Sequence, residues 1–426
     1  MNQSNLKKLQ NLLKEKDIDI FVINRSDEYL NEYISPNAER LNFITNFSGS
    51  AGRAIITPTN AFLYVDGRYT FQANTQINAK EIQPKHLNSF WTDLEKILLE
   101  AEYKIALDPT LHSIIEIEKV EKMLENSTSQ LQLIDKNFVD LIWENQPKTQ
   151  YTDIFDHPTS FAGQGRREKL DILKKFLDQN EIDHYFVSGL DNIAWLLNLR
   201  ADDIKYTPLL YSYLLISKNN KHSLYIKESA MPEILKKEIQ TLININNIEN
   251  IGSIFNNINS SESIGLDFNS TTYYFLDLLR KQKINTKNLA NPCILLKAIK
   301  NETELDGAKK AHIRDGVSIT KYIYWLKNIM DPKSNDEISV AHHLENLRRK
   351  NELFHSLSFD TISAIDKNAA LPHYRVTEEG KSSFSDNNIY LVDSGGQYFD
   401  GTTDITRTII LGEATREQKD RFTRVL

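Results

Sequence analysis

The sequence predicts an α/β protein in which each of the first two domains is built around one central sheet. Apolar stripes at helical spacing alternate with short β-rich runs. The same order of stripe and run occurs twice, first from Leu6 and again 164 residues later from Leu170. Beyond residue 300 the order changes to two long helices followed by strands. Helices that alternate with strands favour a single sheet covered by helices in each domain.

The first copy of this plan occupies the N-terminal region. An apolar stripe at residues 6–13 predicts a helix, and the run at 18–23 predicts the first strand. A short apolar segment at 41–45 follows, and then a strand pair at 54–57 and 62–65. We expect these elements to form one sheet with its covering helices.

The second copy repeats the plan element by element. Its members are the stripe at 170–177, the strand at 182–187, the segment at 193–197 and the strand pair at 213–217 and 223–227. The pair Asn219-Asn220 is a suitable turn between the last two strands. We therefore predict that the two copies share one fold.

The third region has a different organisation. A charged helix is expected at 302–327, followed by a helix at 336–350 and by strands at 359–363, 389–393 and 404–411. The apolar face expected for the first helix consists of Leu305, Ala308, Ile313, Val317 and Ile323.

Polar connecting sequence divides these elements into three domains. Residues 144–165 are polar and include two prolines and two glycines, which is typical of a linker. We place the first domain at 1–142, the second at 143–298 and the third at 299–426.

The composition excludes several classes of protein. Of 426 residues, 40% are hydrophobic and 26% charged, as in ordinary globular proteins, and the net charge of −7 argues against nucleic acid as a partner. The single cysteine, Cys293, rules out an internal disulfide and favours a reducing compartment. The sequence contains neither a signal peptide nor a run of about 20 apolar residues that could span a bilayer. We expect a cytoplasmic protein that binds neither nucleic acid nor membranes.

Two aspartates near the C-terminal end form the principal candidate site. Asp393 ends an apolar run, and Asp404 follows eleven residues later with glycines between them. A hairpin of this length can place both carboxylates side by side, and carboxylate oxygens suit Mn²⁺, Mg²⁺ or similar ions. Both could instead be ordinary turn and strand-edge aspartates, because aspartate is common beside glycine in turns. Metal binding is favoured by Asp393, whose burial without a partner would be costly.

A second candidate is His373, which lies 20 residues before Asp393 in a loop. A histidine there can hydrogen-bond a substrate or a tetrahedral intermediate. The alternative is a loop histidine packed against Tyr374, and the residues alone favour this alternative.

A third candidate is Arg68, in the segment Asp66-Gly67-Arg68-Tyr69 at the end of a strand. An exposed arginine after a glycine can bind a carboxylate of a ligand through two hydrogen bonds. An ion pair with nearby Asp66 is the simpler interpretation.

Nine short segments, spread in order over nearly the whole chain, together carry a family resemblance. These segments are residues 25–30, 39–41, 47–52, 65–69, 190–200, 300–304, 312–316, 358–362 and 393–407. Each is only moderately specific, but together and in this order the sequence resembles the Xaa-Pro aminopeptidases (aminopeptidase P) of the creatinase or pita-bread metallopeptidases. The similarity is to the long, three-domain cytosolic form.

The resemblance implies two related creatinase-type α/β domains followed by a pita-bread catalytic domain. It implies an enzyme that releases the N-terminal residue preceding proline, using two divalent ions, usually Mn²⁺. The family's metal ligands are two aspartates, a histidine and two glutamates. By position, Asp393 and Asp404 would be the aspartate ligands and His373 a histidine that contacts substrate. Arg68 would reach toward substrate or a partner subunit. The implied partners are peptides with proline at the second position and a second copy of the chain in a homodimer.

The sequence departs from the family where the remaining ligands are expected. After Asp404 it has no histidine, and Glu413 and Glu417 are its only glutamates. A capping box of Thr415 and Gln418 predicts a helix, and the chain ends at Leu426, about three turns into that helix. We therefore expect a C-terminally truncated chain with an incomplete pita-bread domain and metal site, inactive on its own.

Two further hypotheses remain open from the sequence. The chain could be a non-catalytic pseudo-peptidase that acts as a dimerisation or partner-binding module. It could also serve another pita-bread chemistry, such as creatinase-type hydrolysis or methionine aminopeptidase activity. The two N-terminal domains disfavour methionine aminopeptidase, which lacks them.

Overall fold

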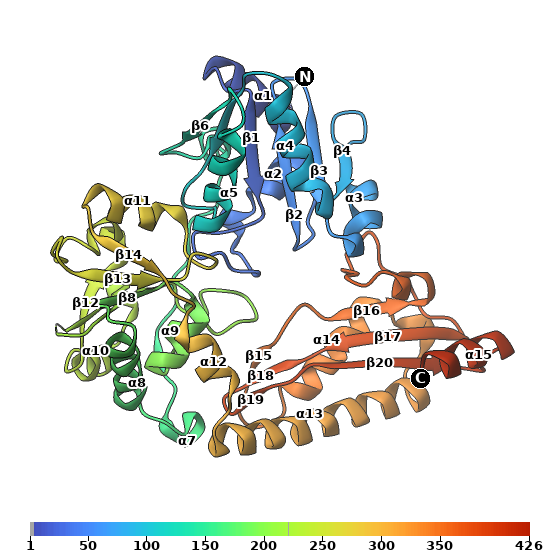
Figure 1. Cartoon of the computed structure of the whole chain (residues 1–426). Helices are drawn as coiled ribbons and strands as arrows, with labels where there is room; N and C mark the ends of the chain where they lie inside the picture. Colours follow the sequence, from blue (N-terminus) through green and yellow to red (C-terminus); the bar gives the residue numbers. More distant parts are fainter. Residues whose placement is uncertain (1–3, 220) are drawn as a thin grey trace. The chain divides into compact units, whose positions relative to one another are not determined.

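A computed structural model describes residues 4–219 and 221–426, so Asn220 of the predicted turn lies outside the described residues. The chain divides into two compact units (Figure 1). Met1–Asp156 and Gln164–Ile299 form one, called here the amino-terminal unit. His157–Gly163 and Lys300–Leu426 form the other, the carboxyl-terminal unit.

The amino-terminal unit contains two six-stranded sheets, and the first has the order β4-β3-β2-β1-β5-β6. Its central strand β1 is buried over its whole length, pairs antiparallel with β2 and runs parallel to β5. The strands are β1 (Ile20–Asn24), β2 (Gly52–Ile56), β3 (Ala61–Val65), β4 (Gln83–His86), β5 (Lys104–Leu107) and β6 (Gln130–Leu133). The accompanying helices are α1 (Asn5–Glu15), α2 (Arg40–Thr45), α3 (Thr70–Gln76), α4 (Phe90–Glu100), α5 (Ile114–Leu124) and α6 (Phe138–Ile142).

The second sheet, β12-β11-β10-β8-β13-β14, repeats the first strand for strand. Its central strand β8 is again antiparallel to one neighbour, β10, and parallel to the other, β13. The strands are β8 (His184–Val187), β10 (Tyr213–Ser217), β11 (His222–Ile226), β12 (Ile243–Asn247), β13 (Ser263–Leu266) and β14 (Asn285–Asn288). The helices are α8 (Arg166–Gln179), α9 (Leu190–Leu197), α10 (Glu233–Ile239), α11 (Tyr273–Lys281) and α12 (Pro292–Ala298). A two-stranded pair of β7 (Phe155–Asp156) and β9 (Leu199–Arg200) lies beside them. The internal repeat predicted from the apolar pattern is confirmed.

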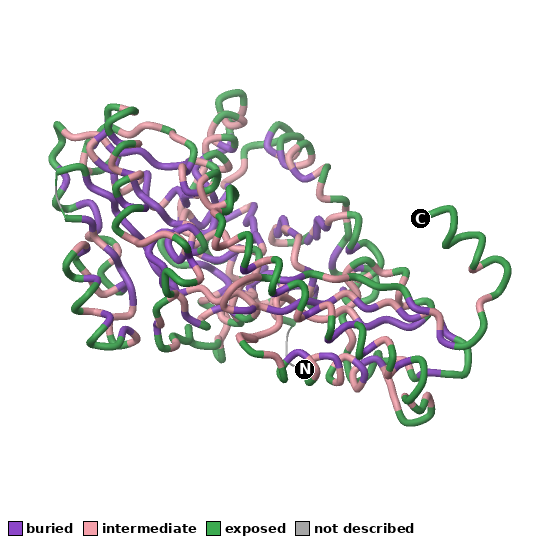
Figure 2. Tube along the Cα trace, turned by 90° about the horizontal axis from the view of Figure 1, so that it is seen from below, coloured by how far each residue is buried: buried purple, intermediate pink, exposed green. Residues whose placement is uncertain are grey.

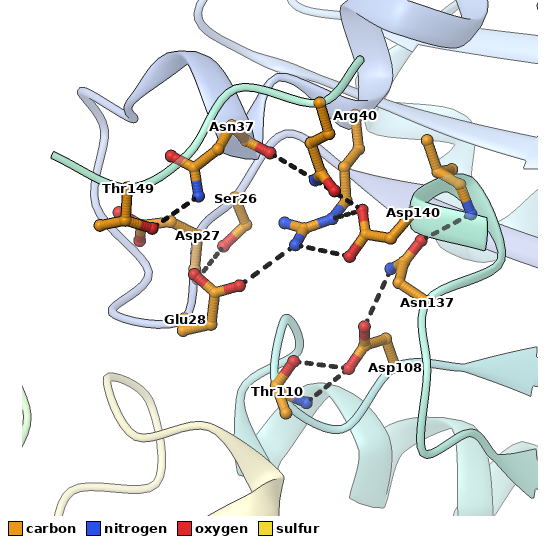
Figure 3. Close-up of polar contacts among 12 residues, drawn as sticks. Ser26, Asp27, Glu28, Asn37, Arg40, Asp108, Thr110, Asn137, Asp140 and Thr149 are labelled. Atoms are coloured by element: carbon orange, nitrogen blue, oxygen red, sulfur yellow. Dashed lines mark hydrogen bonds and ion pairs between the residues drawn. The ribbon is translucent and has the colours of Figure 1, made fainter. Parts of the chain in front are cut away.

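Polar contacts fix the long loop that follows β1. Figure 3 shows the guanidinium group of Arg40 between two carboxylates. Its Nε and Nη2 donate to Asp140 at 2.8 and 3.0 Å, and Nη2 also donates to Glu28 at 3.2 Å. Arg40 is buried, and Glu28 lies in the loop itself, so this arginine ties the loop to α2 and α6.

The carboxyl-terminal unit contains two three-stranded sheets and two long helices. One sheet has the order β16-β17-β20 and the other β15-β18-β19. The strands are β15 (Phe354–Leu357), β16 (Ile362–Ile365), β17 (Asn388–Ser394), β18 (Gly396–Tyr398), β19 (Gly401–Thr402) and β20 (Ile405–Leu411). The helices are α7 (Thr159–Ala162), α13 (Glu302–Asn328), α14 (Glu337–Arg348) and α15 (Arg416–Val425). The core of this unit lies between helices α13 and α14 and the β16-β17-β20 sheet, around Tyr322, Leu344, Tyr390 and Val392.

Two expectations for this unit are corrected. The predicted strand at 359–363 begins later, as β16, and the preceding strand β15 was not predicted. The predicted apolar face of α13 is wrong, because Ile313 is 68% and Val317 46% exposed. The face that is buried carries Gly307, Ala311, Asp315, Ser318, Ile319, Tyr322 and Leu326. It is therefore built largely from small and polar side chains that hydrophobicity alone does not select.

The C-terminal helix forms as predicted. Thr415 and Gln418 make the capping box at the start of α15, and none of its residues is buried (Figure 2). Among the described residues, no helix combines the length and the apolar character that a membrane span requires.

We predict that Arg40→Ala lowers the free energy of unfolding by about 2–4 kcal/mol, because it removes a buried side chain and its three charge-assisted hydrogen bonds to the half-buried Asp140 and Glu28. Arg68→Ala is the matched control. Arg68 is 53% exposed and pairs with Asp66, so its loss should cost less than about 1 kcal/mol. Urea denaturation followed by circular dichroism measures both, and equal costs for the two variants would contradict the structural role of Arg40.

Candidate metal centre

Asp393 and Asp404 lie at the same end of one strand pair. Strands β17 and β20 are antiparallel, with Asp393 opposite Thr406 and Ser394 opposite Ile405. Asp393 is the penultimate residue of β17, and Asp404 directly precedes β20. Asp393 is half-buried and Asp404 is exposed. The pairing of β17 with β20 thus brings together the two carboxylates that the sequence predicted as a site.

The two carboxylates interact electrostatically. Partial desolvation and the neighbouring Asp393 carboxylate raise the pKa of Asp404 above its ordinary value. Asp393 is held by the hydroxyl of Thr406, which donates to its Oδ1 at 2.7 Å. Two neighbouring carboxylates repel each other when both are ionised, and a proton or a cation between them would lower that repulsion.

The donor chemistry of the pair suits a hard divalent cation, because both groups offer carboxylate oxygens. Within residues 4–219 and 221–426, however, no group of three or more histidine, cysteine, aspartate or glutamate side chains could hold a metal ion. Among the described residues, the candidate centre therefore consists of two carboxylates, Asp393 and Asp404.

The segment between the two aspartates is anchored to the helices through Asp315 on α13. Arg348 at the end of α14 donates from Nε and Nη2 to the two oxygens of Asp315 at 2.6 and 3.1 Å. Tyr398 and Thr403 donate their hydroxyls to the same carboxylate at 3.1 and 2.9 Å. The side chains of Asp315 and Arg348 are fully buried. One carboxylate therefore joins α13, α14, strand β18 and Thr403, the residue that directly follows β19.

The third predicted residue, His373, lies half-buried in the loop between β16 and β17. Glu337, the first residue of α14 and fully buried, fixes this loop. The Glu337 carboxylate accepts from the Tyr374 hydroxyl and the Ser382 amide, both at 2.8 Å, and from Asn368 at 2.9 Å. Burial and Glu337 raise the pKa of the Tyr374 hydroxyl. His373 shares the carboxyl-terminal unit with the two aspartates.

Arg68 belongs to the amino-terminal unit, where it forms the simpler of the two predicted contacts. Its Nε donates to Asp66 at 2.8 Å, and Asp66 also caps the short helical turn Gly67–Tyr69. The Arg68 guanidinium lowers the pKa of the Asp66 carboxyl.

The sequence interpretation missed the residues that hold the site, namely Asp315, Arg348, Thr403 and Glu337. A signal for Asp315 was present, since it lies in the segment 312–316 that contributed to the family resemblance. Its partner Arg348 is 33 residues away, and only the packing of α13 against α14 pairs them.

Three family models cover most of the chain. Residues 5–136 and 145–304 each match a creatinase/prolidase N-terminal domain, and residues 306–426 match metallopeptidase family M24. Both aspartates of the candidate metal centre and His373 lie within the M24 match.

Two similar proteins have the same name. The chain is 34% identical over 443 residues to "Probable Xaa-Pro aminopeptidase P" of Paracoccidioides brasiliensis (strain Pb03), covering 99% of this chain and 71% of that protein. It is 36% identical over 439 residues to the protein of the same name from Neosartorya fischeri, covering 99% of this chain and 66% of that protein. The fold is similar to the crystal structure of X-prolyl aminopeptidase from Caenorhabditis elegans, described as a cytosolic enzyme with a di-nuclear active site. That similarity has a TM-score of 0.89 at 27% identity and covers 97% of this chain and 70% of that one.

We predict that Arg348→Met lowers the free energy of unfolding of the carboxyl-terminal unit by about 3–5 kcal/mol, because it leaves the buried Asp315 carboxylate without its cation. The neighbouring Arg349→Met is the control, since Arg349 is 57% exposed and pairs with Glu345 one turn away, so its loss should cost less than about 0.5 kcal/mol. Denaturation followed by tryptophan fluorescence reports the difference. A cost below about 1 kcal/mol for Arg348→Met would refute the proposed weight of this pair.

We predict that Asp404→Asn stabilises the metal-free chain slightly at neutral pH. The folded-state pKa of Asp404 is raised, so ionising it costs stability as the pH rises through that value. The gain should stay below about 1 kcal/mol because Asp404 is exposed, and it should vanish near pH 3, where the carboxyl is protonated in both states. Melting temperatures between pH 3 and 8 test this, with the exposed Asp386→Asn as control. A gain that persists unchanged at pH 3 would exclude the electrostatic cause.

Proposed function

The chain belongs to the Xaa-Pro aminopeptidase P family of metallopeptidases, and from this premise we propose that its carboxyl-terminal unit supplies metal-binding carboxylates for an aminopeptidase. The proposed reaction releases the N-terminal residue that precedes a proline. The observation that carries the proposal is the convergence of Asp393 and Asp404 at one end of the β17–β20 pair, within the region that matches metallopeptidase family M24. Membership in this family makes the chain a relative of metallo-exopeptidases.

We assign roles to individual side chains as follows. Asp393 and Asp404 would hold divalent ions, for which we propose Mn²⁺, through carboxylate oxygens. Bound there, such ions lower the pKa of water and polarise the scissile carbonyl. His373 would donate a hydrogen bond to the substrate, from a loop that Glu337 holds in place. Arg68 would bind a substrate carboxylate or a partner subunit once it exchanges its contact with Asp66.

The proposed substrates are peptides with proline at the second position, and the proposed setting is a cytoplasmic homodimer. We also propose three domains with the limits 1–142, 143–298 and 299–426. The two matching six-stranded sheets support the first two limits, and the change to α13 and α14 supports the third.

The incomplete ligand set leads to a second candidate function. Among the described residues, no histidine, cysteine, glutamate or further aspartate joins the two aspartates in a group that could hold a metal ion. We propose that the chain as it stands binds Mn²⁺ weakly and cleaves slowly or not at all. A non-catalytic role as a dimerisation or partner-binding module is the alternative that this observation favours.

We predict that this chain binds Mn²⁺ with low affinity, that Asp404→Ala abolishes the binding, and that an Arg-Pro-Pro peptide with added Mn²⁺ is not measurably cleaved. Isothermal titration and detection of released arginine measure the two quantities. Asp306→Ala on the exposed side of α13 is the control, because it removes an acidic group outside the candidate centre.

The outcomes separate the alternatives. Cleavage that Asp404→Ala abolishes would overturn the proposed inactivity and establish the aminopeptidase directly. Equal Mn²⁺ binding by wild type and Asp404→Ala would remove Asp404 from the metal site. A protein that binds no Mn²⁺ and cleaves nothing would favour the non-catalytic module.

A further inference from the structure

Thr403, the residue directly before Asp404, has a hydrogen bond at every polar position. Its amide donates to the Gly396 carbonyl at 2.9 Å, and its carbonyl accepts from the Ser358 hydroxyl at 2.9 Å. Its own hydroxyl accepts from the Gly396 amide at 3.0 Å and donates to Oδ2 of Asp315 at 2.9 Å. Thr403 is fully buried, whereas Asp404 is exposed. The residue directly before Asp404 is therefore held rigidly, which restricts where the backbone can place the Asp404 carboxylate.

The acceptor for the Thr403 hydroxyl is itself fixed. Asp315 also accepts from the Tyr398 hydroxyl and from two nitrogens of Arg348, so both of its oxygens are occupied. A carboxylate with these donors cannot rotate without losing several hydrogen bonds in a buried site, which is expensive. The orientation of Thr403 is thus set by α13 and α14.

Close packing adds a steric constraint. A Cβ on Gly395 would collide with the Thr403 carbonyl, and a Cβ on Gly307 would collide with the Asp400 carbonyl. The Asp400 side chain also pairs with Arg314 on α13. The β18–β19 hairpin therefore has little freedom to slide along the helix.

Strand pairing holds the two strands of this hairpin unequally. Strand β18 also pairs with β15, which adds three residue pairs to its ladder. Among the described strands, β19 pairs with β18 alone, through Gln397 with Thr402 and Tyr398 with Gly401. So short a ladder is marginal without further contacts. The hydrogen bonds of Thr403, which follows β19 directly, are contacts that the structure supplies where the chain turns into Asp404.

We propose that Thr403, held by the Asp315–Arg348 pair, is the positioning residue that places Asp404 beside Asp393. The inference rests on the proposed role of Asp404 as a metal ligand and adds a cause for the geometry of that ligand. The polar atoms of Thr403 are all hydrogen-bonded within the protein, so Thr403 would act on a bound ion only through the backbone that it anchors.

The test compares Thr403→Val, which has the same shape but no hydroxyl, with Thr403→Ser, which keeps the hydroxyl. Tyr322→Phe is the control. Like Thr403→Val it removes a fully buried hydroxyl, but Tyr322 lies on α13 and its hydroxyl contacts Tyr390 rather than the β18–β19 hairpin. Two quantities are measured on the full chain. The first is hydrogen–deuterium exchange of residues 395–404, and the second is the affinity for Mn²⁺ from electron paramagnetic resonance of the free ion.

We expect Thr403→Val to speed exchange in residues 395–404 by about five-fold or more and to weaken Mn²⁺ binding by a similar factor. Thr403→Ser should keep both the exchange rate and the Mn²⁺ affinity near their wild-type values, and Tyr322→Phe should change neither. A purely structural role would instead raise exchange throughout the carboxyl-terminal unit. If Thr403→Val fails to fold, Ser358→Ala, which removes only the bond to the Thr403 carbonyl, should change both quantities in the same direction by a smaller factor.

Wild-type exchange in Thr403→Val would overturn the proposal. Faster exchange with unchanged Mn²⁺ affinity would also overturn it, because the hairpin would then move without affecting Asp404. Absence of Mn²⁺ binding by the wild-type chain would contradict the proposed function, and the exchange data alone would then decide whether Thr403 fixes the hairpin.

Discussion

Two opposite charges are buried side by side in the carboxyl-terminal unit, Asp315 on α13 and Arg348 on α14, and neither side chain is exposed to solvent. Removing such charges from water costs several kcal/mol each, and their attraction compensates only when the remaining donors and acceptors are satisfied. Asp315 meets that condition by accepting from Thr403 and Tyr398 as well. The pair therefore constrains the β18–β19 hairpin as well as the two helices, because the hydrogen bonds that satisfy Asp315 form only when the hairpin is in place.

The candidate metal centre depends on this constraint. Asp393 is positioned by the regular pairing of β17 with β16 and β20, but Asp404 follows an irregular segment. Mutual repulsion works against holding the two carboxylates together, and after desolvation it is the next cause of the raised pKa of Asp404. A rigid scaffold has to oppose that repulsion in the metal-free chain. The buried network thus connects helix packing with the chemistry proposed for the two aspartates.

The sequence predicted what depends on local periodicity. The repeated strands around residues 18–23 and 182–187 were found because they are short, apolar and preceded by amphipathic helices. The pair Asp393 and Asp404 was found because its spacing suits a hairpin. The buried face of α13 was not found, because Gly307, Asp315 and Ser318 are not hydrophobic and Ala311 is small. A buried aspartate can be recognised only from its partner, and Arg348 reaches Asp315 through tertiary packing that no local pattern encodes.

The most direct measurement is the anomalous diffraction of manganese in crystals of this chain soaked with Mn²⁺. The account predicts an anomalous peak within coordination distance of both Asp393 and Asp404, with the hydrogen bonds of Thr403 and Asp315 intact. A peak that contacts neither aspartate, or well-ordered carboxylates without any peak between them, would contradict the assignment of this hairpin as a metal-binding element.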